Sequence, residues 1–357
     1  MERPSLSNVI PIRETGAELT IPAVQEPDYD LPFSEGQSEN PFDQFAVSNA
    51  SRVKQVWAIG GGKGGVGKSL IAANLAISLS RLNHRVTAID LDLGAANLHT
   101  ALGIAPPQKT LGDFLSGARS ELGECVTETP LPNLSLISGS QDGLAIADLT
   151  GRDKTKLLQS IRELDSEYVL IDLGAGTGKN TIDFFLYADI GLVTLLPEPT
   201  SIENVYRFLK GVFYRKLLLS PSLSNVREIV QSALDPKNAN GIKTPTDLQN
   251  AIAEMDPEAS LKLKMEIDRL HPKLVVNQVR TQTDIDIGFS VKSVCKKYFG
   301  MELDYVGYLD YDSSVWQSVR RKRPLLTEFP NSKLAANLDR ITKYLLKRHA
   351  NQRSSLL

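Results

Sequence analysis

One stretch constrains the fold more than any other, the glycine-rich run GGGKGGVGKS of residues 60–69. A short apolar run precedes it and a helical pattern follows it, so the sequence predicts a strand, a glycine loop and a helix. Four residues separate Gly62 from Gly67, and Lys68 follows directly. This spacing, with Ser69 next in the chain, is typical of a phosphate-binding loop.

The residue types in this loop suit an anion. Glycines let the backbone curl with its N–H groups pointing inward, and the dipole of the following helix favours negative charge there. We expect Lys68 to contact the terminal phosphates of a nucleotide and Ser69 to ligate Mg²⁺. The residues expected to bind the nucleotide are Gly62, Lys63, Gly64, Gly65, Val66, Gly67, Lys68 and Ser69. A glycine-rich turn without a nucleotide is the alternative, and the flanking strand and helix argue against it.

Acidic residues end two later apolar runs. Asp90 and Asp92 are two residues apart, so both side chains share one face of a strand, about 7 Å from each other. Asp92 could instead cap a helix. Asp172 ends the run YVLID and is followed by Gly174 and Gly176, which would allow the next loop to move. Together with the loop, these acids indicate phosphoryl transfer to water, assisted by positioning and charge neutralisation.

Short apolar runs alternate with helical patterns from residue 53 onward. The expected strands are 56–59, 85–90, 134–137, 168–172, 190–196, 273–277 and 305–308. Strands of this apolar character are buried on both faces, so we predict a doubly wound α/β fold with a mostly parallel sheet. Its ligands should bind at the carboxyl ends of the strands. We expect this domain to cover residues 51–349, with a short C-terminal tail at 350–357.

Residues 214–272 interrupt this alternation. Helical periodicity appears at Leu248, Ile252 and Met255, and again at Leu261, Met265 and Leu270. A structureless loop of this length is improbable in a compact domain, so we predict a small helical insertion. The insertion could be a partner surface or a simple elaboration of the fold.

The first 50 residues differ from the rest in composition. Residues 21–45 contain six carboxylates and no Lys or Arg, and such a segment is not expected to fold alone. We interpret it as a solvated tail. The alternative is a docking peptide built on Phe33, Phe42 and Phe45.

Two basic features lie near the C-terminus. A helix over residues 333–348 carries an apolar stripe and nearby Lys and Arg residues, which suits the closing helix of an α/β domain or a helix lying on an anionic membrane. We favour the core helix. The run Arg320–Arg323 indicates a solvated face, with DNA binding as the alternative.

The overall composition gives few further constraints. The net charge of −2 provides no global attraction to nucleic acid, so DNA or membrane binding would need a local patch. The two cysteines, Cys125 and Cys295, are far apart and fit reduced thiols. We find neither a signal peptide nor an apolar run of the roughly 18 residues that span a bilayer. We therefore expect a cytoplasmic protein, with a peripheral position at the membrane as an option.

Lys63, directly after the first glycine of the motif, is an additional lysine. With it, the loop resembles the deviant Walker motif of the MinD/ParA class of ATPases. The resemblance implies an ATP-dependent homodimer in which Lys63 crosses to the phosphates of the partner subunit. It also implies that Asp92 orients the attacking water, that Asp90 lies near the magnesium and Ser69, and that Asp172 is the Walker B acid.

Later segments extend the resemblance to residues 53–347. Val275–Val279 resembles a strand of this class whose asparagine, here Asn277, reads adenine, so ATP is the expected nucleotide. The segments Pro197–Ser201 and Phe329–Ser332 most resemble the FlhG (FleN) and MinD branch. That branch implies control of the placement or number of a cellular machine, either the flagellum or the division site, through a protein partner bound by the tail or the insertion.

Other classes that share such loops fit less well. A ParA-like DNA-segregation ATPase is the main alternative, through the run Arg320–Arg323. An Mrp-like iron–sulfur carrier needs paired cysteines, which the sequence lacks. A bacterial tyrosine kinase ends in a tyrosine cluster, whereas only Tyr344 follows Tyr311 here. An ATP-dependent metabolic enzyme would need a small-molecule pocket, for which no residues are evident.

Overall fold

The computed structural model describes residues 54–92, 96–139, 149–234, 241–242 and 244–354, with side chains up to residue 347. The predicted tails, residues 1–50 and 350–357, lie mostly outside these ranges. The exceptions are the backbone of two short paired strands near the N-terminus and the backbone of residues 350–354 in the last helix. That pair is β1 (Pro11–Ile12) and β2 (Leu19–Thr20).

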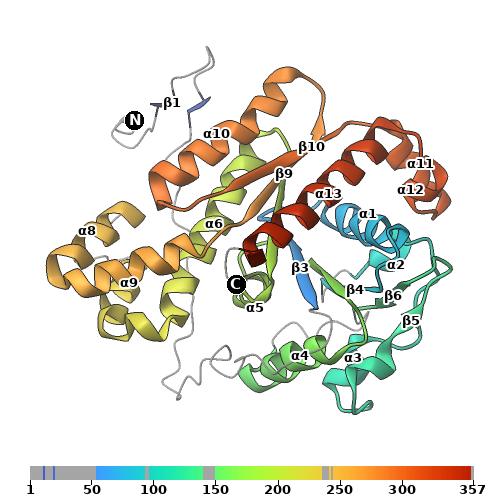
Figure 1. The fold of residues 1–357 in the computed structure, drawn as a ribbon, viewed down its shortest axis with the longest axis horizontal. Coiled ribbons are helices and arrows are strands. Elements are labelled where there is room, and N and C mark those ends of the chain that lie inside the picture. The colour runs from blue at the N-terminus through green and yellow to red at the C-terminus, as the bar shows by residue number, and fades with distance from the viewer. Residues whose placement is uncertain are drawn as a thin grey trace, which may run out of the picture.

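An eight-stranded sheet forms the centre of the molecule, in the order β10-β9-β8-β3-β7-β4-β6-β5 (Figure 1). All neighbours are parallel except β5 and β6. The bounds are β3 Gln55–Gly60, β4 Val86–Leu91, β5 Thr127–Glu128, β6 Leu134–Ile137, β7 Tyr168–Leu173, β8 Ile190–Leu195, β9 Lys273–Val279 and β10 Asp304–Asp310. The predicted doubly wound α/β fold is therefore confirmed, and every expected strand is present.

The central strand β3 shows why these apolar runs form a buried sheet. Val56 and Ala58 join the hydrophobic core on one face, while Trp57 and Ile59 join the core on the other. Since side chains alternate along a strand, a run buried on both faces must be apolar throughout. Strand β3 lies between β7 and β8, so the loop that follows it opens at the point where the strand order reverses.

Helices cover both faces of the sheet (Figure 1). Those whose side chains enter one core include α1 (Lys68–Arg81), α2 (Leu98–Ala101), α12 (Leu325–Glu328) and α13 (Lys333–Ser354). The other core includes α3 (Leu111–Leu115), η1 (Leu122–Cys125), α4 (Gly151–Glu163), α5 (Lys179–Tyr187), α6 (Pro199–Leu219) and α10 (Gln282–Phe299). Helix α11 (Ser313–Arg321) lies between β10 and α12 in the chain.

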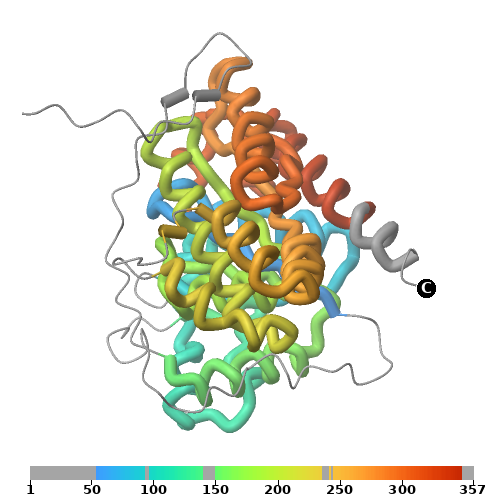
Figure 2. Tube along the Cα trace, turned by 90° about the vertical axis from the view of Figure 1, so that its left-hand side faces the viewer, coloured from blue at the N-terminus to red at the C-terminus, as the bar shows by residue number. Residues whose placement is uncertain are grey.

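The predicted insertion is helical where the structure describes it. It contains η2 (Pro221–Val226), α7 (Arg227–Ser232), α8 (Pro245–Met255) and α9 (Pro257–Asp268). Helices α8 and α9 form the end of the molecule that lies on the left of Figure 1 and faces the viewer in Figure 2. Both begin with Pro at the first turn after a capping side chain, which fixes their starts.

The apolar residues that indicated a helix here are not the ones that α9 buries. Leu261 and Met265 are exposed, and α9 instead packs through Ala259, Leu263 and Ile267. Both sets of residues recur at intervals of four, so periodicity alone did not distinguish them. On α8, Leu248 and Ile252 are buried as expected, whereas Met255 is exposed.

The C-terminal helix α13 closes one face of the sheet. Leu334, Leu338, Ile341 and Leu345 are each no more than 2% exposed and belong to the core around α1. The core-helix interpretation is therefore confirmed for this stripe. No helix in the described part of the chain combines the length and the apolar character needed to cross a membrane.

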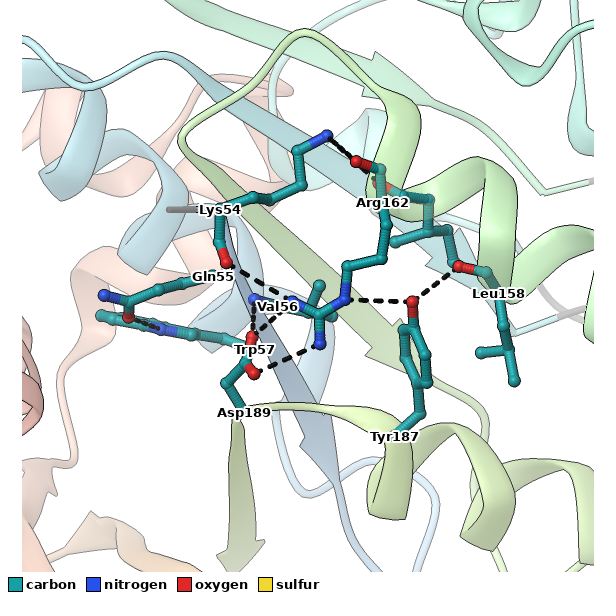
Figure 3. Close-up of polar contacts among 9 residues, drawn as sticks. Lys54, Gln55, Val56, Trp57, Leu158, Arg162, Tyr187 and Asp189 are labelled. Carbon is teal, nitrogen blue, oxygen red and sulfur yellow. Dashed lines mark hydrogen bonds and ion pairs between the residues drawn. The ribbon is translucent and has the colours of Figure 1, made fainter. Parts of the chain in front are cut away.

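A polar network anchors the amino-terminal end of β3, whereas the glycine loop follows its carboxyl-terminal end (Figure 3). The Lys54 ammonium donates to the carbonyls of Ile161, Arg162 and Leu164 at the C-terminal end of α4, where the helix dipole is negative. Asp189 accepts hydrogen bonds from the Val56 amide at 2.7 Å and from the Arg162 guanidinium at 2.9 Å. The network thereby joins β3 to α4 and to the start of β8.

Candidate functional site

The glycine loop runs from the end of β3 to the start of α1. Gly67 is the N-cap of α1 with φ 95°, and Gly65 has φ 76°, backbone conformations that favour glycine. Gly62 packs directly on α6, because a Cβ atom there would lie 2.0 Å from the backbone oxygen of Asn204. The loop therefore needs glycine for its path as well as for contact with a ligand.

Lys68 is the first residue of α1, and its side chain is held within the loop. Its ammonium donates to the Lys63 carbonyl at 3.3 Å, and the residue is only 7% exposed. Burial lowers the pKa of Lys68, while the negative charges of Asp172 and Asp92 raise it. Anionic phosphate oxygens would supply the counter-charge that this buried ammonium lacks.

Asp172, at the end of β7, is the most unusual group of the site. It is 1% exposed, and neither carboxylate oxygen has a hydrogen-bond partner among the residues that the structure describes. Burial, reinforced by the negative charge of Asp90, raises the pKa of Asp172 to about 8, although the nearby Ser69 hydroxyl and the Lys68 ammonium act to lower it. A carboxylate that is buried without hydrogen-bond partners is stabilised in its charged form by a nearby cation.

Asp90 lies beside Asp172, because the two residues are paired in register on β4 and β7. Its oxygens accept hydrogen bonds from the backbone amides of Asp92 at 3.1 Å and Leu98 at 2.9 Å. Burial raises the pKa of Asp90 to about 6, and these amides oppose the shift. Asp90 thus binds the amide that follows β4 and the amide that begins α2, and its predicted position near magnesium stays a prediction.

Asp92 follows β4 and faces the loop after β7. A Cβ atom on Gly174 would lie 3.3 Å from its Oδ1 atom. Helix α2 begins at Leu98 with Asn97 as its N-cap, so Asp92 does not cap it. The carboxylate therefore lies beside the loop after the neighbouring strand β7. It is close enough for its negative charge to raise the pKa of Lys68.

Lys63 points toward the start of α6. Its ammonium forms an ion pair with Glu198 at 3.2 Å and donates to the Thr200 hydroxyl at 3.2 Å. The side chain is 37% exposed, so it can leave this contact without disrupting the core. The sequence did not predict this pairing, although Glu198 follows a strand beside β3 and so belongs to the same edge of the sheet.

Asn277 on β9 braces the loop. It is 4% exposed, its amide donates to the Val66 carbonyl at 2.8 Å, and its oxygen accepts from the Gln278 amide at 2.9 Å. A Cβ atom on Gly67 would lie 2.4 Å from the same amide nitrogen. Adenine recognition by Asn277 remains a prediction, and its contact with the loop is an additional role.

These groups fit a magnesium ion that arrives with a nucleotide. Within the described ranges, no group of three or more His, Cys, Asp and Glu residues is arranged to hold a metal alone. Mg²⁺ is commonly held by one or two carboxylates together with phosphate oxygens and water. Asp172, whose oxygens have no hydrogen-bond partner among the described residues, and the neighbouring Ser69 hydroxyl offer hard oxygen donors of that kind.

Comparison with known proteins agrees with this geometry. Residues 57–344 match the model of the CobQ/CobB/MinD/ParA nucleotide-binding domain. The antiactivator FleN of Pseudomonas aeruginosa is 27% identical over 281 residues, which cover 78% of this chain and 81% of FleN. The flagellum site-determining protein YlxH of Helicobacter pylori is 34% identical over 162 residues, 43% of this chain and 52% of that protein.

Solved structures show the same fold. The septum site-determining protein MinD of Pyrococcus horikoshii, complexed with Mg-ADP, superposes with a TM-score of 0.57 at 19% identity, covering 82% of this chain and 96% of that one. The family match includes the glycine loop and the strands that carry Asp90, Asp172 and Asn277. The chain therefore belongs to the CobQ/CobB/MinD/ParA family of nucleotide-binding domains.

Proposed function

We propose that this chain binds and hydrolyses ATP slowly and acts as a switch that dimerises when ATP is bound. The observation that carries the proposal is the convergence of two lysines and three carboxylates on one glycine loop. Lys68 supplies the positive charge inside the loop, and Lys63 is an additional cation at its rim. No covalent intermediate is needed for phosphoryl transfer to water.

Each residue has a distinct role in this proposal. Lys68 binds the terminal phosphates, and Ser69 and Asp172 hold the magnesium, with Asp90 beside them. Bound Mg²⁺ would neutralise charge that develops on the phosphate oxygens. Asp92 orients the attacking water from its place between the loops after β4 and β7, where Gly174 leaves room for it.

Lys63 links hydrolysis to dimerisation in this scheme. In the single chain its ammonium is held by Glu198 and Thr200. We propose that it exchanges these partners for phosphate oxygens bound by a second copy of the chain. Exposed ion pairs are worth at most about 1 kcal/mol, so the contact with Glu198 can be given up readily.

The comparisons favour a role at the flagellum. FleN matches over 78% of this chain, whereas a putative MinD of Chlorella vulgaris matches over 48%. We propose that the switch controls flagellar number or placement through a protein partner. In the source organism, loss of the chain should change the number of flagella per cell, and unchanged flagella with misplaced division sites would favour the MinD role.

Nucleotide-dependent dimerisation tests the biochemical part. Size-exclusion chromatography with light scattering should show a dimer with ATP and Mg²⁺ and a monomer without them. Lys68→Ala should lose nucleotide binding, and Asp92→Ala should bind ATP and remain dimeric because hydrolysis is blocked. Hydrolysis at the wild-type rate by Asp92→Ala would show that Asp92 does not orient the water.

The Lys63 contact has its own test. Glu198→Gln removes the ion pair while keeping the size of the side chain, so dimerisation should occur at lower ATP concentration. Glu203→Gln is a control within α6, whose N-cap is Glu198, since it removes an ion pair with Arg207 instead. Equal ATP dependence of the two variants would contradict the proposed exchange.

A further inference from the structure

Helix α11 presents an aromatic and basic surface. Trp316 is 63% exposed and Val319 is 49% exposed. Arg320 lies over the Trp316 ring, with its guanidinium carbon 5.1 Å from the ring centre. These residues are three and four positions apart, so they share one face of the helix. We call this face, together with the following residues 321–323, the Trp316 surface.

The Trp316 surface has a surplus of positive charge. Arg321 and Arg323 both form ion pairs with Glu328. Arg320 and Lys322 are exposed as well, and no ion pair of theirs is seen within the described ranges. Two of the four consecutive cations therefore pair with Glu328, and the other two lie beside an exposed indole without an ion pair among the described residues. A ligand for this surface should combine acidic groups with aromatic or apolar side chains.

A segment of the same chain has this composition. Residues 21–45 carry six carboxylates, no Lys or Arg, and the aromatic residues Phe33, Phe42 and Phe45. We propose that this segment docks on the Trp316 surface, with its phenylalanines against Trp316 and Val319 and its carboxylates beside residues 320–323. Phe45 lies within about 30 Å of Lys54 along an extended chain and Phe33 within about 70 Å. A domain of this size is about 50 Å across, so the segment can reach the surface.

The observations favour this occupant over nucleic acid. Binding to DNA phosphates requires several available cations, and two of the four are already paired with Glu328. The chain as a whole carries a net charge of −2. The acidic segment matches both features of the surface, because aromatic side chains pack on an indole and carboxylates pair with arginines.

The Trp316 surface is connected to the candidate nucleotide site by contacts through α2. The turn after α11 packs on the segment after α2, since a Cβ atom on Gly103 would lie 2.7 Å from Pro324 and 2.9 Å from the Lys322 carbonyl oxygen. Helix α2 in turn begins at Leu98, whose amide is bound by Asp90. A change in the loop after β4 could therefore reach the Trp316 surface through α2.

Tryptophan fluorescence provides the test on the full chain. The chain has two tryptophans, and Trp57 is only 1% exposed, so collisional quenching by acrylamide reports mainly on Trp316. The docked segment should protect Trp316. Phe33→Ser combined with Phe42→Ser and Phe45→Ser should raise the quenching constant severalfold without changing the melting temperature.

Charge variants and salt make the test more specific. Asp28→Asn with Asp30→Asn and Glu35→Gln should raise quenching in the same way. In wild type, 1 M salt should also raise it, because the Debye length falls from about 10 Å at 0.1 M to about 3 Å. Glu254→Gln with Asp268→Asn is the control, because it neutralises two exposed acids of the insertion and should leave quenching unchanged.

Three outcomes would overturn the proposal. Quenching that is equal in wild type and in both segment variants would show that the segment does not cover Trp316. Protection that disappears on dilution would assign the docked segment to a second copy of the chain. Protection of Trp316 that appears only when duplex DNA is added would make the surface a nucleic-acid site.

Discussion

Replacing Asp172 by Asn should stabilise the nucleotide-free protein. Asp172 is buried and its oxygens lack hydrogen-bond partners among the described residues, so burial raises its pKa to about 8, against about 3.9 in an unfolded chain. Between these two pKa values the unfolded chain releases the carboxyl proton, whereas the folded protein must keep it. The cost of Asp172 to stability therefore grows from about pH 4 to about pH 8.

The expected magnitude follows from this interval. Between pH 5 and pH 8, three pH units at about 1.4 kcal/mol each set an upper bound of about 4 kcal/mol on the growing advantage of Asp172→Asn. The neighbouring Asp90 shares the titration, and the amide of the new Asn needs partners of its own. We expect a net gain of about 2 kcal/mol at pH 8 in EDTA, measured by urea unfolding.

A second buried aspartate provides the control. Asp183 is fully buried like Asp172, but it accepts hydrogen bonds from Arg215 at 2.6 Å and from Lys154. Asp183→Asn leaves the buried Lys154 and the partly buried Arg215 without their counter-charge and should lose about 3 kcal/mol. The same chemical change thus has opposite signs at the two sites.

Ligands should reverse the ranking of Asp172→Asn and wild type. A ligand at 100 times its dissociation constant stabilises a protein by about 2.7 kcal/mol, and only wild type should gain the Mg²⁺-dependent part of this effect. Asp172→Asn that is no more stable than wild type in EDTA at pH 8 would refute the argument. So would an advantage that does not grow between pH 5 and pH 8.

Three further substitutions test the packing around the site. Gly62→Ala places a methyl group 2.0 Å from the Asn204 carbonyl oxygen, so it should cost about 2 kcal/mol in urea unfolding and weaken nucleotide binding in titrations; unchanged binding would contradict the fit. Asn277→Ala leaves the Val66 carbonyl without its 2.8 Å bond and should cost about 1–3 kcal/mol by the same assay. Leu345→Ala should cost about 3 kcal/mol because the side chain is 1% exposed, whereas a membrane-facing leucine would leave stability in solution unchanged.

Much of the fold could be predicted because the composition of each strand indicates its burial without reference to distant parts of the chain. Strands buried on both faces must be apolar throughout, so runs such as residues 168–172 identify themselves. The glycine loop likewise carries its own geometry, since positive φ at Gly65 and Gly67 requires glycine. Asp90 and Asp172 each end a predicted parallel strand, so they were expected at the same end of the sheet as the loop.

Contacts between distant parts of the chain could not be predicted in this way. Lys63 and Glu198 are separated by 135 residues, and only the sheet order brings them together. The orientation of α9 was ambiguous because two apolar series with the same period compete, and packing against α6 and η2 selects the one that contains Leu263. The sequence likewise could not show that the Asp172 oxygens lack hydrogen-bond partners among the described residues, because this depends on which side chains the fold brings around them.

The network around Lys54 has a mechanical consequence for the phosphate loop. Arg162 and Asp189 bind the beginning of β3 on the side of the sheet away from the loop, and neighbours pair with β3 along both of its edges. The strand is thus fixed at its rear and sides, so local opening should cost most there and hydrogen exchange of its amides should be among the slowest in the molecule. The glycine loop therefore extends from a strand that is held at its start by Asp189 and along both of its edges by neighbouring strands.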